Sequence, residues 1–178
     1  MKQRVGFLSG FFVAGLFAVA IIIKIFAPAS ASAEGSPGAS NDEVMIERGR
    51  YLVKIAGCND CHTPNYMVTP DDVQEEDYLI GVPVGWFGPW GTTYASNLRI
   101  TVEDFPEDVW VQILKTRKAM PPMPWVNVNA LTEADSRAMY RYIKSLGVNG
   151  ERMPPILSPG EMPQTPYFDF HIKGLPEG

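Results

Sequence analysis

The sequence predicts an all-α domain with an N-terminal apolar segment before it and a proline-rich tail after it. Three stretches between residues 41 and 147 show apolar residues at helical spacing, each beginning with a helix-start signal. An apolar run of 19 residues lies ahead of them at residues 5–23, and the tail, residues 148–178, contains six prolines. A chain of 178 residues has room for one domain with extensions rather than for two full domains.

The apolar run at residues 5–23 predicts an export or anchoring segment. It is close to the roughly 20 residues that cross a bilayer and longer than the roughly 7–15 apolar residues of a cleaved signal peptide. Lys2 and Arg4 precede it, which orients the following chain away from the cytoplasm. We therefore expect a signal-anchor or transmembrane helix over residues 1–27. Cleavage of a signal at an A-x-A site ending in Ala33 is the alternative.

Composition separates this segment from the rest of the chain. Residues 28–40 are small, polar and rich in Gly and Pro, which predicts a flexible tether. Only 3 of the 15 basic residues precede Ala33 and all 20 acidic residues follow it, so residues 34–178 carry a net charge of −8. Such an acidic domain argues against a nucleic-acid partner. It favours a basic protein surface, in a contact that salt weakens.

The first domain helix is expected to begin after Ser40, which forms a capping-box pattern with Glu43, and to reach about Gly57. Gly49 lies inside it. A glycine in a helix interior costs about 1 kcal/mol relative to alanine. We therefore expect another element to approach closely at Gly49.

Two further helices follow in the domain, which we place at residues 41–147. One is predicted from near Pro106 to Lys118, because proline favours the first helical turn. The other is predicted to start at Thr132 and to end at Gly147. The inner face of this last helix consists of Ala138, Met139, Tyr142, Ile143 and Leu146.

The remaining segments contain many helix breakers. Residues 63–100 predict loops, without a convincing strand. Their aromatic residues Trp86, Phe87 and Trp90 cover either the apolar face of a cofactor or ordinary packing partners. The acidic residues between 71 and 77 form a solvated face or a docking patch. The tail is expected to wrap the domain or to dock onto a partner.

The chemistry lies in Cys58-Asn59-Asp60-Cys61-His62, a C-x-x-C-H motif typical of covalent c-type haem attachment. Each thiol can bond one haem vinyl group, and His62 is then placed as the proximal ligand of the iron. These are the only two cysteines of the chain. The motif therefore predicts one haem c, held by Cys58 and Cys61.

Three other uses of the motif are less well supported. A zinc site needs about four ligands, and only His171 remains to add one. A thioredoxin-like dithiol belongs near a βαβ pattern, which is absent. A structural disulfide fits the spacing but gives His62 no role.

The sixth iron ligand is sought among methionines in rigid segments. Met120 and Met123 lie in a proline-rich loop between two predicted helices, and prolines lower the entropic cost of holding a sulfur at the iron. His171, in the tail, is a further candidate. An open sixth position would instead give a site that binds small molecules.

A helix ending in C-x-x-C-H, a Met-Pro loop and a C-terminal helix with an inward tyrosine resemble a class I cytochrome c domain. Three stretches resemble, more closely, the cytochrome c subunits of bacterial periplasmic alcohol and gluconate dehydrogenases. The resemblance covers roughly Val44 to Leu146. The three stretches are Arg48-Gly-Arg-Tyr-Leu-Val-Lys-Ile-Ala-Gly-Cys-Asn-Asp-Cys-His-Thr-Pro64, Gly88-Pro-Trp-Gly-Thr-Thr-Tyr-Ala-Ser-Asn-Leu98 and Met120-Pro-Pro-Met-Pro-Trp125.

The resemblance implies specific roles. It selects Met123 over Met120 as the iron ligand, because the ligand in that family belongs to a Met-Pro-aromatic triplet. It also implies that the first and last helices cross, with Gly49 facing an aromatic such as Tyr142. Those subunits usually carry two or three haems, whereas this chain has one motif. The loop after Leu98 is shorter here, which predicts a more exposed haem edge. Further candidates for contacts to the haem or its propionates are Trp90, Tyr94 and Asn97.

Together these observations predict an electron-transfer protein rather than an enzyme: a single-haem c-type cytochrome that carries one electron at a time between redox proteins. We expect it to be a subunit of a respiratory or dehydrogenase complex and to take no small-molecule substrate. We place it in the bacterial inner membrane with the haem domain on the periplasmic side, or soluble in the periplasm after cleavage at Ala33. A haem sensor or haem enzyme with a labile sixth ligand, and a mainly structural subunit, are the alternatives.

Overall fold

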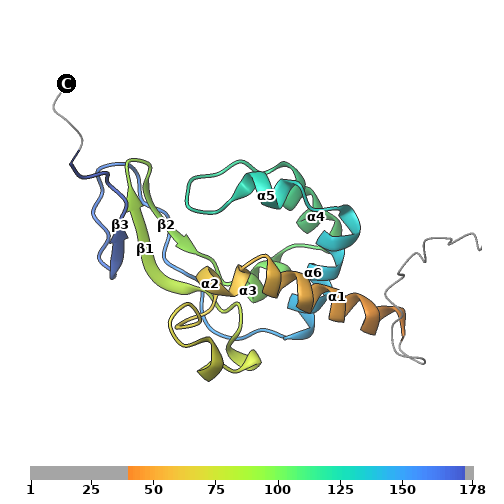
Figure 1. Cartoon of the computed structure of the whole chain (residues 1–178). Coiled ribbons are helices and arrows are strands. Elements are labelled where there is room, and N and C mark those ends of the chain that lie inside the picture. Colours follow the sequence, from red (N-terminus) through yellow and green to blue (C-terminus); the bar gives the residue numbers. More distant parts are fainter. Residues whose placement is uncertain (1–39, 175–178) are drawn as a thin grey trace, which may run out of the picture. The chain divides into compact units, whose positions relative to one another are not determined.

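A computed structural model describes residues 40–174, which form a helix-rich domain with one small sheet (Figure 1). The helices are α1 (Asn41–Ile55), α2 (Cys58–His62), α3 (Leu98–Asp104), α4 (Glu107–Thr116), α5 (Trp125–Asn129) and α6 (Glu133–Ser145). The strands are β1 (Val82–Gly88), β2 (Gly91–Ala95) and β3 (Tyr167–Asp169). Two single 3₁₀ turns are η1 (Pro70–Asp72) and η2 (Glu75–Asp77).

Helices α1 and α6 cross at Gly49, as expected from the sequence (Figure 1). The capping box at the start of α1 is complete: Ser40 accepts from the Glu43 amide, and the Glu43 carboxylate accepts from the Ser40 amide. A Cβ atom at Gly49 would lie 2.0 Å from the carbonyl oxygen of Ala138 and 2.7 Å from Cβ of Tyr142. Gly49 therefore permits the backbones to approach, and it faces the predicted tyrosine.

The hydrophobic core is built mainly around α6. Four residues of its predicted inner face, Ala138 to Ile143, are buried, and Leu146 is partly buried against them. Trp110 of α4 is also buried and donates its indole N–H to the Ser136 carbonyl at 3.1 Å. Helix α4 begins after Pro106, as predicted, but ends at Thr116 rather than at Lys118. The core accordingly joins the three helices that the sequence predicts.

The sheet corrects the prediction of an all-α domain without strands. Its order is β2-β1-β3, with β1 antiparallel to β2 and parallel to β3. Pro83 and Gly85 suggested a loop, since both residue types are depleted in strands. The register shifts between Val82 and Gly85, so the ladder is irregular where the proline lies. The third strand comes from the distant tail, and no local pattern predicts such a pairing.

The tail wraps the domain, one of its two expected roles. Leu157 and Thr92 exchange two backbone hydrogen bonds, of 3.0 and 3.1 Å, and β3 pairs with β1 further on. Trp86 packs on Phe168 with ring centroids 5.1 Å apart, and Phe87 on His171 at 4.8 Å. The aromatic residues of β1 therefore pack largely on the tail, rather than on the helices.

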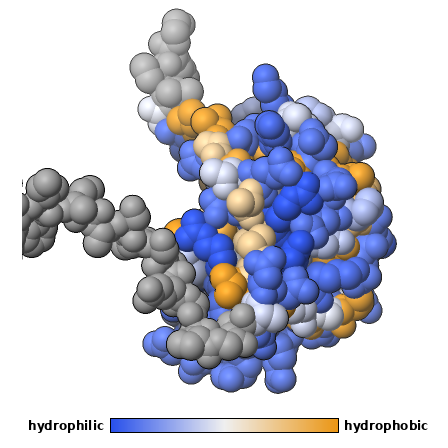
Figure 2. Space-filling view, turned by 90° about the vertical axis from the view of Figure 1, so that its right-hand side faces the viewer, coloured by the Kyte–Doolittle hydropathy of each residue, from blue (hydrophilic) through white to orange (hydrophobic). Residues whose placement is uncertain are grey.

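Within residues 40–174, no helix is long and apolar enough to cross a membrane. The predicted transmembrane or signal segment and nearly all of the tether lie outside the described residues. On the face shown in Figure 2, hydrophilic residues dominate and hydrophobic residues form separate spots. Most of the acidic residues from Asp71 to Asp77 are exposed, as expected for a solvated face; Glu75 is half-buried and forms an ion pair with Arg50.

Candidate functional site

A left-handed glycine connects α1 to the C-x-x-C-H motif. Gly57 has φ +67°, a conformation that side chains other than glycine's rarely adopt. A Cβ atom there would also lie 2.9 Å from a carboxylate oxygen of Asp60. The chain turns at this residue, and α2 begins at Cys58. The motif therefore forms a separate helical turn directly after α1.

Both cysteines are free thiols and half-buried. Burial raises the pKa of Cys58 to about 11. Burial, and then the charge of Asp60, raise the pKa of Cys61. A dithiol used for disulfide exchange has a depressed thiol pKa. The environment of these thiols therefore argues against the thioredoxin-like interpretation.

His62 is 7 % exposed, and its Nδ1 lies 2.7 Å from the backbone oxygen of Ser96. A carbonyl can only accept, so Nδ1 carries the proton and donates it. Burial lowers the pKa of His62, while the bond to Ser96 partly offsets that shift. The imidazole ring is therefore neutral, with its proton on Nδ1. Its other nitrogen, Nε2, has no proton and keeps a free lone pair. A hydrogen bond that fixes the tautomer and the orientation of the ring is the usual support for a metal-ligating histidine.

The backbone around His62 is also fixed. Thr63 donates its hydroxyl to Oδ1 of Asn59 at 2.8 Å and accepts the amide N–H of Leu79 at 2.8 Å. The amide of Gly81 donates to the His62 carbonyl at 2.8 Å. Asn59, Thr63 and Leu79 are all buried. The segment before β1 thus holds the end of the motif helix in place.

The methionine loop, residues 117–124, is held against β2. Thr93 of β2 donates its hydroxyl to the carbonyl of Pro121 at 2.7 Å. At the base of the loop, Asn129 donates to the carbonyls of Leu114 and Arg117. Met123 is half-buried in this loop. Thr93 lies in β2 and Ser96 directly follows that strand, so one short segment contacts both the loop of Met123 and the imidazole of His62.

Three buried polar atoms have no hydrogen-bond partner among the described residues: Nε1 of Trp90, Nε1 of Trp125 and Oγ1 of Thr92. Buried indole N–H groups normally find an acceptor. A haem brings two propionate carboxylates, which are acceptors. Free thiols, a neutral histidine with a free Nε2 and two unpaired indole donors together fit a covalently bound haem.

Trp125 was not among the residues predicted to contact the cofactor. It follows Met123 and Pro124 in the loop, and the guanidinium of Arg117 lies 5.3 Å from its ring centroid. The sequence signal that could have identified Trp125 is its place as the aromatic residue of the Met-Pro-aromatic triplet. The Ser96 carbonyl could not be found from sequence, because a backbone atom leaves no residue-type signature.

The structure gives Tyr94 and Asn97 protein partners. Tyr94 shares a hydrogen bond of 2.9 Å with the hydroxyl of Thr165 in the tail. Asn97 caps α3 by accepting from the Ile100 amide, and its amide nitrogen donates to the carbonyls of Asn149 and Glu151. Contacts of these two side chains to a haem stay predictions.

The other candidate ligands of the iron lie in different surroundings. His171 is bonded to Asp169 at 2.6 Å and lies against Phe87 on the sheet. Met120 is half-buried in the methionine loop. Among residues 40–174, no three His, Cys, Asp or Glu side chains are grouped so that they could hold a metal ion.

Sequence comparison with known proteins relates this chain to one class of protein. The chain is similar to cytochrome c subunits. It is 29 % identical over 111 residues to the cytochrome c subunit of the quinone alcohol dehydrogenase of Gluconobacter oxydans (strain 621H). The matched stretch covers 57 % of this chain and 21 % of that protein. It is 25 % identical over 132 residues to the corresponding subunits of Gluconacetobacter polyoxogenes and Komagataeibacter europaeus, covering 68 % of this chain and 25 % of each.

The chain thus spans about a fifth to a quarter of the length of these relatives. No protein-family model matches the chain, and no solved structure matches it. The similarity supports a cytochrome c-like relationship.

Proposed function

We propose that this protein is a single-haem c-type cytochrome that transfers one electron at a time within a dehydrogenase or respiratory complex. Cys58 and Cys61 hold the haem through thioether bonds, and His62 and Met123 ligate the iron. The observation that carries the proposal is the hydrogen bond from His62 to the Ser96 carbonyl, because it keeps the proton of a buried, neutral imidazole on Nδ1 and leaves Nε2 free to bind iron. Similarity to cytochrome c subunits supports it independently.

The haem, when bound, supplies an iron that alternates between two oxidation states without changing its ligands. The protein's residues do the rest. The Ser96 carbonyl keeps the proton on Nδ1 and orients the ring of His62. Thr93 restrains the methionine loop through Pro121. The unpaired indole N–H groups of Trp90 and Trp125 would be available as donors to the propionates of the haem.

Location and partners are part of the proposal. An apolar segment at residues 5–23 anchors the protein in the bacterial inner membrane or directs its export, with the haem domain on the periplasmic side. Anchoring keeps the domain near its donor and acceptor and raises their effective concentration. The relatives are subunits of a quinone alcohol dehydrogenase, which supports a complex of this general kind.

Haem retention after denaturation tests the attachment. The full chain, expressed with a cytochrome c maturation system, is predicted to keep one iron per chain after acid-acetone extraction, because thioether bonds survive that treatment. The double variant Cys58→Ala/Cys61→Ala is expected to lose all haem on extraction. His62→Ala is expected to lose most of it, and His171→Ala, the matched control with the other histidine of the chain, to keep it. Complete extraction of haem from the unmodified protein would refute the proposal.

A further inference from the structure

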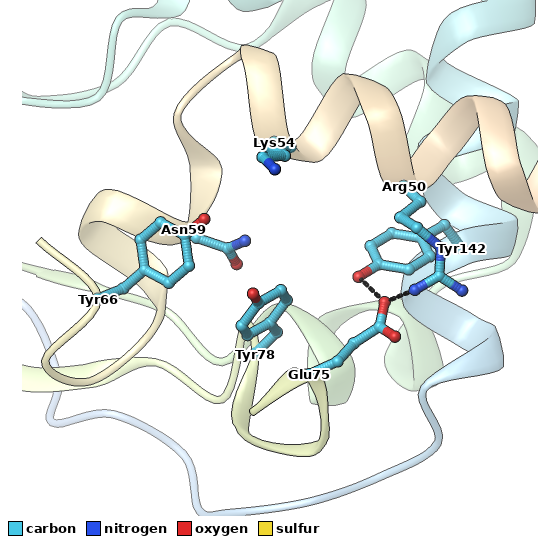
Figure 3. Close-up of a pocket in the computed structure, with 7 residues that line it drawn as sticks. All are labelled: Arg50, Lys54, Asn59, Tyr66, Glu75, Tyr78 and Tyr142. Carbon is cyan, nitrogen blue, oxygen red and sulfur yellow. Dashed lines mark hydrogen bonds and ion pairs between the residues drawn. The ribbon is translucent and has the colours of Figure 1, made fainter. Parts of the chain in front are cut away.

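A small cleft lies on the side of α2 that carries Asn59 and Thr63, whereas the thiols Cys58 and Cys61 share a different helix face. Its volume is about 230 Å³. This is below the roughly 300–1,000 Å³ of pockets for drug-sized ligands, so it suits a small molecule. Figure 3 shows side chains from α1, α2, α6 and the segment between them surrounding its centre. The lining residues are Arg50, Lys54, Asn59, Tyr66, Glu75, Tyr78 and Tyr142.

One wall of the cleft presents the amide donor of Asn59. Asn59 is 2 % exposed, and its Oδ1 accepts the hydroxyl of Thr63 at 2.8 Å. That bond directs the amide nitrogen of Asn59 toward the centre of the cleft (Figure 3). No described residue accepts a hydrogen bond from this nitrogen. The nitrogen is not among the fully buried unpaired atoms, so it reaches the open space of the cleft, where the acceptor of a ligand can bond it.

The positive charge of the cleft comes from Lys54. Arg50 forms an ion pair with Glu75, whose Oε1 also accepts the hydroxyl of Tyr142 at 2.7 Å (Figure 3). Arg50 and Glu75 therefore neutralise each other. Lys54 has no ion-pair partner within residues 40–174. The net charge around the cleft is thus one positive charge, close to the unpaired amide of Asn59.

Part of the lining is aromatic. The rings of Tyr66 and Tyr78 meet edge to face, with centroids 5.4 Å apart and planes at 87°. Burial raises the pKa of Tyr78 and raises that of Tyr142 to about 12, so both hydroxyls stay protonated at neutral pH. The hydroxyl of Tyr142 already donates to Glu75. The cleft therefore combines donors, one unpaired cation and flat apolar surfaces.

We propose that this cleft binds a small monocarboxylate, with its carboxylate on Lys54 and Asn59 and its apolar part against Tyr66 and Tyr78. One unpaired cation beside flat apolar surfaces suits a singly charged anion with an apolar part better than a phosphate dianion. The cleft shares Asn59 with the hydrogen bonds that fix the backbone around His62. It includes neither thiol nor the imidazole, so carboxylate binding is tested separately from the proposed function.

Titration calorimetry of the full chain, with its covalent cofactor as isolated, tests the site. Sodium benzoate, sodium acetate and sodium phosphate are compared at constant ionic strength. Saturable binding is expected for both carboxylates, tighter for benzoate because its ring packs on the tyrosines, and not for phosphate. Lys54→Gln is expected to weaken benzoate binding about tenfold, because a charge-assisted hydrogen bond is lost.

Lys115→Gln is the matched control, since Lys115 is an exposed lysine of α4, away from the cleft lining. It is expected to leave benzoate affinity unchanged. Equal affinities in the two lysine variants, tighter binding of phosphate than of benzoate, or no saturable binding of either carboxylate would each overturn the proposal. Tyr66→Phe tests the aromatic wall: benzoate should still bind more tightly than acetate, and loss of that preference would contradict the placement of its ring.

Discussion

The Nδ1 atom of His62 lies 2.7 Å from the backbone oxygen of Ser96, the residue that directly follows strand β2. Three residues earlier, Thr93 donates to the carbonyl of Pro121 in the methionine loop. Three residues of a strand span about 10 Å. This short segment of chain therefore fixes the separation between His62 and the loop that carries Met123.

Loosening that loop is predicted to make the sixth ligand labile. Thr93→Val keeps the β-branched shape but removes the hydroxyl that donates to Pro121. A hydrogen bond of this kind contributes about 1 kcal/mol, so the rate of carbon monoxide binding to the reduced protein should rise roughly fivefold. Stopped-flow absorbance measures the rate. Thr101→Val on α3, which also loses a hydroxyl bonded to a backbone carbonyl, should leave the rate unchanged; equal acceleration in both variants would contradict the role of β2.

Adding a methyl group at Gly49 is predicted to destabilise the crossing of α1 and α6. The new Cβ would lie 2.0 Å from the Ala138 oxygen, so the helices must separate. Overpacking of this kind costs about 1–3 kcal/mol or more, which outweighs the roughly 1 kcal/mol that alanine gains in helix propensity. Urea unfolding of Gly49→Ala measures the change. Gln112→Ala, on the exposed side of α4, should stay within about 0.5 kcal/mol; unchanged stability of Gly49→Ala would mean that the crossing is not tight.

Replacing Arg99 is predicted to destabilise the C-terminal end of α6. Arg99 is 5 % exposed, and its guanidinium donates to the carbonyls of Leu146, of Gly147 (2.5 Å) and of Glu76 (2.6 Å). In Arg99→Met these carbonyls lose a charged donor, at a cost of about 2–4 kcal/mol. Arg117→Met, with an exposed arginine, is the control. Similar midpoints of urea unfolding for the two variants would show that the three bonds add little stability.

Acid is predicted to release the tail. The pKa of Asp169 is lowered by hydrogen bonds from the His171 backbone, the His171 ring and then Lys173; that of Asp104 is lowered by Arg152. Because both folded values lie below the ordinary value of about 3.9, the stabilisation is fully present above about pH 4 and is lost as the pH falls through the folded values. Hydrogen exchange along residues 149–174 should therefore accelerate in acid.

The charge-removing variant Asp169→Asn should accelerate that exchange already at neutral pH, by removing the acceptor of His171 and Lys173. Asp71→Asn, with another exposed carboxylate, should not. Unchanged exchange of the tail in Asp169→Asn would show that backbone pairing of β3 with β1 is sufficient to hold it.

The helices and the motif could be predicted because their signals are local. Each helix start is marked within one turn, by Ser40 with Glu43, by Pro106 and by Thr132. Gly49 predicted that another helix approaches closely, and its contacts with Ala138 and Tyr142 confirm this prediction. The sheet could not be predicted, because it depends on pairing between β1 and β3, about 80 residues apart in sequence. Pro83 and the glycines of that region predict a loop, but pairing with a distant strand makes the segment a strand instead.

The groups that support His62 and the methionine loop could likewise not be predicted from the sequence. The Ser96 carbonyl and the Pro121 carbonyl are backbone atoms, and their positions depend on the hairpin and on the loop. The unpaired indole of Trp125 becomes informative only once its burial is known. Residue types identified Cys58, Cys61 and His62, and only the structure supplied the groups that orient them.

Carbon monoxide binding to the dithionite-reduced, full-length protein, followed by absorbance, tests the central claim most directly. If His62 and Met123 fill both axial positions of a covalently held haem, the reduced spectrum will show a c-type haem and will not change when carbon monoxide is added. Prompt formation of a carbon monoxide complex in the unmodified protein would contradict the account, because the sixth position would then be open and the chain would be a haem sensor or enzyme.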